Sequence, residues 1–436
     1  MSTDFQADPS TPKDSHPAHE PFSLEWLEQA GASFPKLRID YLEGGERGVF
    51  ARADIAPGEE VLRVPRGCLL TFDVASASDI GRRIAAHAPS ASEESCLAAF
   101  LLQERSRENS CWKPYLDPLP AAFPHLPLFF DEHDLSFLKG SAMLGEVARW
   151  RALLLGEYAF LCERVPGFSR FTPDAFLWAQ LVLVSRTFGM KLGGKLVRCF
   201  VPLADMLNHR QSPHGLWGPS ADETAFVLVA REAVSAGEEF HISYGVKSNF
   251  RFLLNYGFVP EDNPQDELLL HLGIPESDPL ALVKRELLGL SSPTALRRFE
   301  VPLYYDHATT AAMFSFLRVA HANEEELASI TSAANASGGL GVIEPLSVDN
   351  EERVLRTLGE LCEARLAGFE TTLEEDEQLL RDAELSRNAR TCLLLRRGEK
   401  RLLHAFAGLA RTFLPTLRSA SPGPEDTSAQ SDQRVG

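Results

Sequence analysis

The fold of this chain is best inferred from one segment, Val201-Pro-Leu-Ala-Asp-Met-Leu-Asn-His-Arg210. It places Asp205, Asn208 and His209 directly after an apolar strand. The simplest interpretation is a turn at the end of a strand, with side chains bonded to the local backbone. A metal centre is not favoured, because the nearest other histidines lie in unrelated segments. A serine hydrolase is not favoured either, because the chain has no G-x-S-x-G elbow.

A second polar segment is Phe240-His-Ile-Ser-Tyr-Gly-Val-Lys-Ser-Asn249, in which Tyr244 leads into a glycine at the predicted end of a strand. A second Tyr-Gly pair follows in Asn255-Tyr-Gly-Phe258. Each pair alone is compatible with a core aromatic residue beside a turn. Together with Asn249, the two pairs predict a polar pocket with aromatic walls.

Short predicted strands flank a helical region on both sides. Alternating apolar residues and turn residues predict strands over 37–42, 49–51, 61–64, 197–202, 225–230 and 239–244. A short helix capped by Ser23 is predicted over 22–31, and residues 75–190 are predicted to be mostly helical, with one helix over 173–188. Strands and helices do not alternate along the chain, and no G-x-G-x-x-G or Walker loop occurs. The pattern therefore predicts an α+β fold and not a nucleotide-binding α/β fold.

The C-terminal part is predicted to be helical from about residue 275. Apolar residues at spacings of three and four predict one long helix over 349–382 and a second over 386–412. Two long antiparallel helices indicate a second lobe. Both ends, 1–20 and 418–436, are poor in large apolar residues and are predicted to be disordered tails.

Composition excludes several classes of function. The chain has 436 residues and a net charge of −18, which argues against broad nucleic-acid binding. It has no apolar run long enough to span a membrane, so no membrane association is expected. The N-terminal segment lacks both a hydrophobic signal region and the Arg-rich bias of a transit peptide. Seven dispersed cysteines without a C-x-x-C pair predict reduced thiols and no zinc cluster. A cytoplasmic or nuclear location is expected.

Several motifs in order along the chain resemble those of SET-domain methyltransferases. The motifs are Gly45-Glu-Arg-Gly-Val-Phe-Ala51, Ala56-Pro-Gly-Glu59, Pro202-Leu-Ala-Asp-Met-Leu-Asn-His209, Ser243-Tyr-Gly245 and Asn255-Tyr-Gly-Phe258. Their order and spacing are similar to the class with a split SET domain and a helical substrate-binding domain. That class includes the plant Rubisco large-subunit lysine methyltransferase and the actin-histidine methyltransferase.

The resemblance implies S-adenosylmethionine as cofactor, with no metal, and a protein as substrate. It implies a SET domain over 21–265 with the helical insertion at about 75–190, and an all-α substrate-binding domain over 270–415. A monomer is expected. The resemblance to plastid enzymes leaves a plastid location open, against the missing transit segment. A SET-fold protein that binds a partner without catalysis is the alternative from another class.

The resemblance also implies roles for individual residues. Tyr244 is the expected catalytic residue, whose hydroxyl orients the acceptor nitrogen. Arg186 is expected to pair with the cofactor carboxylate. The expected cofactor-binding residues are Glu46, Arg47, Arg186, Asp205, Asn208, His209, Tyr256, Gly257 and Phe258. Related lysine enzymes carry Glu before the first glycine turn, where this chain has Gly45 followed by Glu46.

Two positions favour lysine over histidine as the methyl acceptor. The histidine enzymes resemble Arg-Gln-Asn and Pro-Leu-Trp-Asp where this chain has Arg186-Thr-Phe188 and Pro202-Leu-Ala-Asp205. Phe188 has no amide to bind an imidazole nitrogen, and Ala204 leaves the pocket wider. Phe188, Ala204, Tyr244 and Tyr256 are therefore the expected substrate-binding residues. Histidine methylation remains the alternative.

Overall fold

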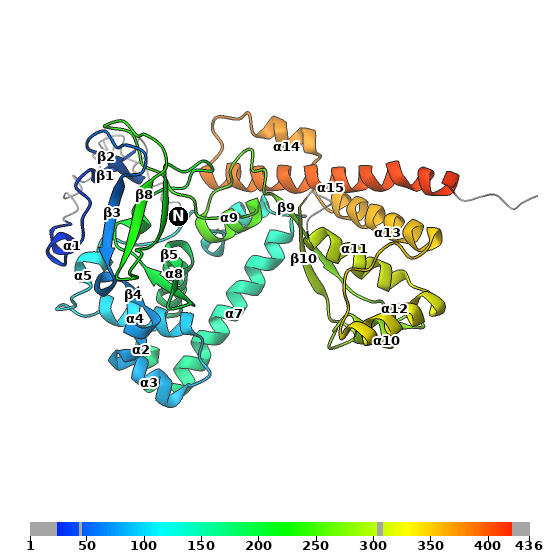
Figure 1. Ribbon diagram of the computed structural model, residues 1–436, viewed down its shortest axis with the longest axis horizontal. Coiled ribbons are helices and arrows are strands. Elements are labelled where there is room, and N and C mark those ends of the chain that lie inside the picture. The colour runs from blue at the N-terminus through cyan, green and yellow to red at the C-terminus, as the bar shows by residue number, and fades with distance from the viewer. Residues whose placement is uncertain (1–23, 43–45, 303–307, 421–436) are drawn as a thin grey trace, which may run out of the picture. The chain divides into compact units, whose positions relative to one another are not determined.

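The computed structural model describes residues 24–42, 46–302 and 308–420 (Figure 1). The chain divides into two compact units, which we describe separately. Unit 1 contains residues 1–121 and 160–244, and unit 2 contains residues 122–159 and 245–436. The predicted N-terminal tail and cap residue Ser23 lie outside the described residues, as does the predicted C-terminal tail except for its first three residues, which continue the last helix.

Small antiparallel sheets form the frame of unit 1. β1 (Leu37–Tyr41) pairs with β2 (Arg47–Ala51). A second sheet has the order β3 (Glu60–Pro65), β8 (Ala225–Ala230), β7 (Gly215–Pro219), and a third has the order β4 (Leu70–Thr71), β6 (Lys195–Phe200), β5 (Thr187–Leu192). Their apolar faces meet in one core that also takes in Phe240 and Ile242. Segments from both sides of the helical insertion thus share sheets.

One predicted strand of unit 1 is wrong. Residues 239–244 form only isolated bridges in the structure, between Phe50 and Glu239 and between His209 and Ile242. The alternation of this segment still buries Phe240 and Ile242 completely. The bridge at His209 brings the two polar segments of the sequence side by side.

Helices cover the sheets of unit 1. They are α1 (Glu25–Gln29), α2 (Phe72–Ala77), α3 (Asp79–His87), α4 (Glu93–Arg105), α5 (Lys113–Leu116) and α8 (Pro173–Arg186). The hydroxyl of Thr172 caps the start of α8. The predicted helix over 173–188 ends two residues early, because Thr187 and Phe188 pair with β6 as the first residues of β5. Arg186 is therefore the last residue of a buried helix, close to the predicted site.

Unit 2 is mostly helical, with one two-stranded sheet of β9 (Glu267–Leu272) and β10 (Arg297–Pro302). Its longer helices include α7 (Ala142–Arg164), which continues into unit 1, and α11 (Ala308–His321), α12 (Glu324–Ser337), α13 (Val348–Ala367) and α15 (Arg387–Ala420). Shorter helices are α6 (Glu132–Ser136), α9 (Asn249–Tyr256), α10 (Ala281–Leu287) and α14 (Leu373–Leu379). Figure 1 shows α13 lying along α15. Gly359 permits this close approach, since a β-carbon there would lie 3.2 Å from that of Ala410. The α+β fold with a helical C-terminal domain is confirmed, but the prediction that this domain is all-α is wrong, because β9 and β10 pair within it.

The single helix predicted over 349–382 is two helices in the structure. α13 ends at Ala367, and α14 begins after Thr372. Thr372 and Glu375 form a reciprocal capping box that starts the second helix. The predicted helix over 386–412 is confirmed as α15, which extends further to Ala420.

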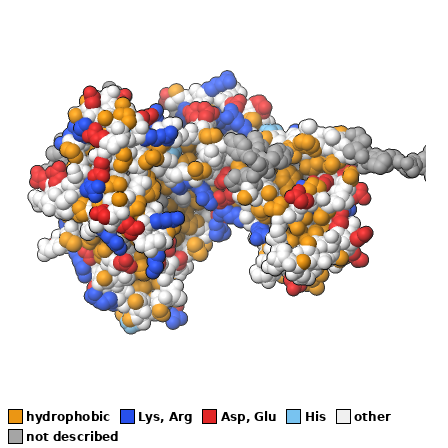
Figure 2. All heavy atoms as spheres, in the orientation of Figure 1, with side chains coloured by type: hydrophobic (Ala, Val, Ile, Leu, Met, Phe, Trp, Pro, Cys, Tyr) orange, Lys and Arg blue, Asp and Glu red, His pale blue; other side chains and the backbone are white. Residues whose placement is uncertain are grey.

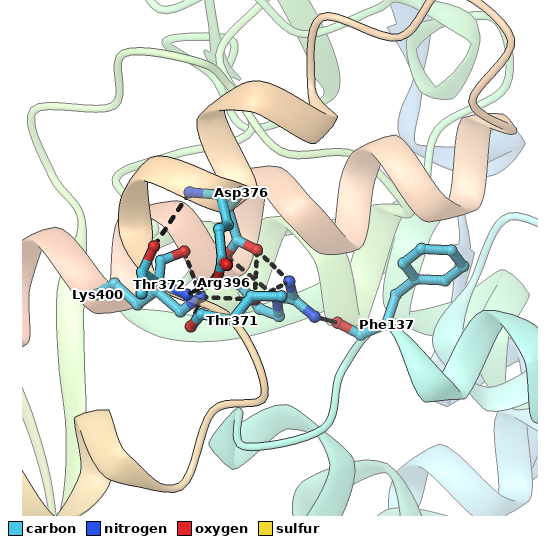
Figure 3. A network of polar contacts seen from close by, with 7 residues as sticks. Phe137, Thr371, Thr372, Asp376, Arg396 and Lys400 are labelled. Carbon is cyan, nitrogen blue, oxygen red and sulfur yellow. Dashed lines mark hydrogen bonds and ion pairs between the residues drawn. The ribbon is translucent and has the colours of Figure 1, made fainter.

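A buried charge cluster joins α14 to α15 (Figure 3). Asp376 on α14 is fully buried and pairs with Arg396 and Lys400 on α15. The Lys400 Nζ donates to Asp376 Oδ2 at 2.6 Å and to the Thr371 carbonyl at 2.7 Å. Burial alone would raise the pKa of Asp376, but hydrogen bonds from Arg396, Lys400 and Thr371 outweigh it and lower the pKa.

Candidate active site

A buried carboxylate holds the arginine at the end of α8. The Arg186 Nη1 donates to the Asp205 carbonyl at 2.9 Å and lies 3.4 Å from the Asp205 Oδ2, and the Tyr115 hydroxyl donates to that oxygen at 2.9 Å. Leu203, two residues before Asp205, has a φ of 70°, a backbone conformation that residues with a β-carbon rarely adopt. Burial raises the pKa of Asp205 and, more strongly, that of Tyr115. Because the Asp205 side chain is fully inaccessible, it acts on its surroundings through Arg186.

A second arginine lies in the electrostatic field of the same cluster. Arg47 opens β2, and its pKa is lowered first by burial and then by the charge of Arg186. Glu46 precedes it and is exposed, while Gly45 lies outside the described residues. The buried carboxylate of Asp205 therefore acts electrostatically on both Arg47 and Arg186.

Asn208 connects the start of β2 to the segment that precedes Tyr244. Its Nδ2 donates to the Arg47 carbonyl at 2.9 Å and to the Glu239 Oε1 at 2.7 Å. Gly48 leaves room for this arrangement, because a β-carbon at that position would overlap the present position of the Glu239 carboxylate. His241 Nε2 lies 3.2 Å from the other oxygen of Glu239. The amide of Asn208 is thus held from two sides.

Tyr244 and His209 lie together at the end of these segments. The Tyr244 hydroxyl donates to the Leu207 carbonyl at 2.9 Å, and the Tyr244 amide N–H donates to the His209 Nδ1 at 3.1 Å. The two ring centroids are 5.3 Å apart. The ring nitrogen that accepts from the backbone is unprotonated, which fixes the tautomer of a neutral His209. The predicted catalytic tyrosine therefore has a fixed hydroxyl.

Phe188 and Ala204 belong to the buried core of unit 1. Phe188 is 8% exposed, and its ring packs edge-on against Trp217 and Phe226 at centroid distances of 5.0 and 5.3 Å. Ala204 is fully buried in the 3-10 turn that carries Asp205. The structure thus makes both positions rigid, and their contact with a substrate stays a prediction.

The last three predicted site residues lie in unit 2, at the end of α9. Tyr256 ends the helix, and Gly257 follows with a φ of 76°. A β-carbon at Gly257 would collide with His125, so only glycine fits there. The rings of Tyr256 and Phe258 pack around Phe252 at 6.2 and 5.1 Å. Burial raises the pKa of Tyr256 to about 12, so its hydroxyl is neutral at physiological pH. The role of these residues in cofactor binding stays a prediction.

Reasoning from the sequence missed two residues, Tyr115 and Glu239. Both lie in contact with predicted site residues, at Asp205 and Asn208 respectively. In the sequence, each is only a single tyrosine or glutamate near a turn motif, which gives no specific sign of a role in the site. Asn249, which the sequence places in a polar pocket, is only 4% exposed, and its amide bonds to neighbouring side chains of unit 2. It belongs to the frame of α9 and not to a pocket wall.

The residues of unit 1 fit the cofactor that the resemblance implies. Nε of Arg186 and Oδ1 of Asp205 are buried, and each lacks a hydrogen-bond partner in the described part of the chain. The positive charge of Arg186 and Arg47 suits the carboxylate of an amino-acid group. The expected pairing of Arg186 with the cofactor carboxylate changes in one respect. Nη1 of Arg186 is already bonded to Asp205, so the other guanidinium nitrogens would have to bind the cofactor.

Removal of the Tyr115 hydroxyl tests the importance of the buried cluster. We expect Tyr115→Phe to lower the free energy of unfolding by about 1–3 kcal/mol, because Asp205 then loses a donor that water cannot replace. Urea unfolding followed by circular dichroism measures this difference. Ser90→Ala, which removes a hydroxyl from an exposed turn, is the control, for which no comparable loss is expected. Equal stability of the two variants would show that the bond to Asp205 contributes nothing.

Two family models and several known proteins match this chain. The SET domain model matches residues 46–245, and the Rubisco LSMT substrate-binding model matches residues 275–403. An actin-histidine N-methyltransferase of Plecturocebus moloch is 30% identical over 93% of this chain and 71% of its own length. The chloroplastic fructose-bisphosphate aldolase-lysine N-methyltransferase of Arabidopsis thaliana is 32% identical over 82% of this chain and 75% of its own. The chain belongs to the SET-domain protein methyltransferases.

Solved structures of related methyltransferases have folds similar to that of this chain. A crystal structure of the SET domain of LSMT bound to lysine and AdoHcy has a TM-score of 0.77, with 26% identity and 91% of each chain covered. A structure of Rubisco LSMT bound to AdoMet has a TM-score of 0.76, with 27% identity over 91% of this chain and 92% of that chain. The prediction of an S-adenosylmethionine-dependent methyltransferase with a protein substrate is confirmed.

Within the described ranges, no group of three or more His, Cys, Asp or Glu side chains could hold a metal ion. Among the same residues, no helix is long and apolar enough to cross a membrane. On the face shown in Figure 2, acidic and basic side chains are interspersed. Such a surface does not by itself select a partner by charge.

Proposed function

We propose that this SET-domain methyltransferase transfers a methyl group from S-adenosylmethionine to the side-chain nitrogen of a lysine in a protein. The observation that carries the proposal is the pair Phe188 and Ala204. Phe188 offers a hydrocarbon ring where an amide would be needed to bind imidazole. Packing against Trp217 and Phe226 keeps that ring in place, so it cannot turn away to admit a polar group.

A lysine acceptor suits apolar and aromatic surroundings. Its alkyl chain gains from contact with hydrocarbon, and its ammonium group is attracted to the face of an aromatic ring. Ala204 is buried and has only a methyl side chain, so it fills less space at this position than the indole expected in a histidine enzyme. These properties favour a long, flexible acceptor over a flat ring.

The hydroxyl of Tyr244 is arranged to orient an amine. It gives its only proton to the Leu207 carbonyl, so toward an acceptor amine its oxygen can act only as a hydrogen-bond acceptor. This bond would direct the nitrogen lone pair along a fixed line. S-adenosylmethionine, when bound, supplies a methyl group on a positively charged sulfur, which also disfavours a protonated acceptor.

The acceptor must lose a proton before it can react. Bringing a lysine from its usual pKa of ~10.4 to 7 requires about 4.6 kcal/mol. Without full compensation by the enzyme, kcat/KM for a lysine acceptor rises with pH as the neutral amine becomes more abundant. An imidazole acceptor has an ordinary pKa near ~6.5 and is already neutral above pH 7.5 or so.

A pH profile therefore tests the proposed acceptor. With labelled cofactor and lysate proteins as substrate, we expect the initial rate of label transfer to rise up to about tenfold per pH unit between pH 7 and 9. A Tyr244→Phe variant measured in parallel gives the background. A rate that levels off by pH 7.5 would favour an imidazole acceptor.

Histidine is the second candidate acceptor. The observation in its favour is the 30% identity to actin-histidine N-methyltransferases over most of this chain. The aldolase-lysine enzyme is similar to the same extent, at 32%. Overall similarity thus does not choose the acceptor, and the choice depends on positions 188 and 204.

A further inference from the structure

A buried hydrogen-bonded group in unit 2 holds the start of α9. Asp266, in the loop before β9, accepts from the backbone N–H of Asn249 at 2.8 Å and from its Nδ2 at 2.9 Å. The backbone N–H of Glu267 donates to the same carboxylate at 3.0 Å. Asn249 is the first residue of α9, so one carboxylate fixes both the backbone and the side chain at this end of the helix.

The opposite side of the Asn249 amide is also occupied. The Asn263 Nδ2 donates to the Asn249 Oδ1 at 3.0 Å and to the Lys247 carbonyl at 2.8 Å. Asn249 is therefore bonded through its backbone N–H and both polar atoms of its side chain. The side-chain amide of Asn249 can therefore point only one way, with Nδ2 toward Asp266, because an ionised Asp266 accepts hydrogen bonds and cannot donate them.

Helix α15 packs directly against this pair. At Gly398, a β-carbon would lie 2.7 Å from Asp266 Oδ2 and 3.4 Å from Asn249 Nδ2. A glycine in the interior of a helix lowers helix stability, so its presence here needs a reason. The reason is the space that Asp266 occupies.

The other end of α9 carries the aromatic residues of the predicted site. The helix has eight residues, and Tyr256, Gly257 and Phe258 follow at its end. Phe252 on the same helix packs against the rings of Tyr256 and Phe258. Because α9 is only eight residues long, we expect a change at Asn249 to be transmitted to these rings.

We propose that Asp266 is a positioning residue for methyl transfer, which acts through Asn249 to fix α9 and thereby the segment Tyr256–Phe258. Gly398 of α15 completes the arrangement by leaving room for the carboxylate. The inference rests on the proposed function in one respect, since the role of Tyr256–Phe258 comes from the family resemblance. Burial raises the pKa of Asp266 to about 6, while three N–H donors favour its ionised form.

An exchange of the two partners tests the proposal. Asp266→Asn turns an N–H toward the Nδ2 of Asn249, so two donors face each other. We expect kcat/KM to fall about 10–100-fold, because small displacements of site residues have effects of this size, and the Kd for S-adenosylmethionine to rise. The double variant Asp266→Asn/Asn249→Asp restores a donor opposite an acceptor and leaves Asn263 a carboxylate to bond. It should recover kcat/KM to within about threefold of the wild type.

A second pair of variants separates positioning from folding. Gly398→Ala places a methyl group against Asp266 and should also lower kcat/KM and weaken cofactor binding. Gly408→Ala in the same helix is the matched control, because nothing lies within 4 Å of a β-carbon there. Both substitutions favour the helix equally, so only the first should impair the enzyme. Calorimetry of cofactor binding and the melting temperature are measured for all variants.

Several results would overturn the proposal. These are an unchanged kcat/KM and Kd in Asp266→Asn, a folded double variant that recovers neither, or losses that simply follow the melting temperature in every variant. If Asp266→Asn does not fold, the double variant and Gly398→Ala decide the question in the same way. The ratios between variants hold for either acceptor, so finding methylhistidine would refute the proposed function without affecting this test.

Discussion

Replacing Tyr244 with phenylalanine is expected to lower kcat by about two orders of magnitude while leaving the affinity for S-adenosylmethionine within about twofold. The substitution removes one oxygen and keeps the ring that packs beside His209. The lost oxygen is held by the Leu207 carbonyl and would no longer orient the acceptor nitrogen. Because that interaction matters most during the reaction, kcat should fall more than cofactor affinity.

Initial rates with labelled cofactor, together with calorimetry of cofactor binding, measure the two quantities. Tyr158→Phe on α7 is the matched control, since it removes a tyrosine hydroxyl from a residue outside the predicted site. Turnover of Tyr244→Phe equal to that of the control would remove Tyr244 from its assigned role. An equal fall in turnover and affinity would assign it to cofactor binding.

The second large effect is expected at Asp376. Asp376→Asn leaves two buried cations, Arg396 and Lys400, without their counter-charge. Lys400 is only 1% exposed and cannot reach water without moving α14 away from α15. We therefore expect the free energy of unfolding to fall by about 3–5 kcal/mol.

Chemical denaturation of the full chain at pH 7 measures this loss. Glu377→Gln is the matched control, because Glu377 also joins α14 to α15 by pairing with Arg401, but in a solvent-exposed position. Exposed pairs contribute at most about 1 kcal/mol. A loss at Asp376 no larger than that of the control would mean that the buried cluster does not hold the two helices together.

Local patterns in the sequence predict much of the fold correctly. The apolar helix that begins at Pro173 and the strand over 225–230 both appear in the structure. The order of the polar motifs was enough to predict the family. Each of these features depends on neighbours within a few residues, where spacing determines the periodicity of burial.

The parts that the sequence did not predict depend on distant contacts. Tyr115 reaches Asp205 across 90 residues, and Asn208 reaches Arg47 across 161. No local pattern encodes such pairs, because they arise from which strands share a sheet. The segment 239–244 shows the same limit, since its alternation is real but its backbone forms only isolated bridges. The break after Ala367 was missed because an apolar spacing continues across two separate helices.

The proposed role of Asp266 also depends on contacts that local sequence patterns do not predict. The polar segment that ends at Asn249 indicated a site residue, and the structure shows that its amide supports α9 instead. Gly398 would not stand out in the sequence of a long helix, yet its place beside Asp266 is one of the tightest in unit 2. Residues that support a site are thus visible only after the fold brings their partners together.

Identification of the modified atom tests the central claim most directly. The purified enzyme is incubated with a cell lysate and deuterated-methyl S-adenosylmethionine, and labelled peptides are fragmented in a mass spectrometer. A lysine methyltransferase places the label on the side-chain nitrogen of lysine, and Tyr244→Phe abolishes most of it. Label on an imidazole nitrogen of histidine, with none on lysine, would contradict the account.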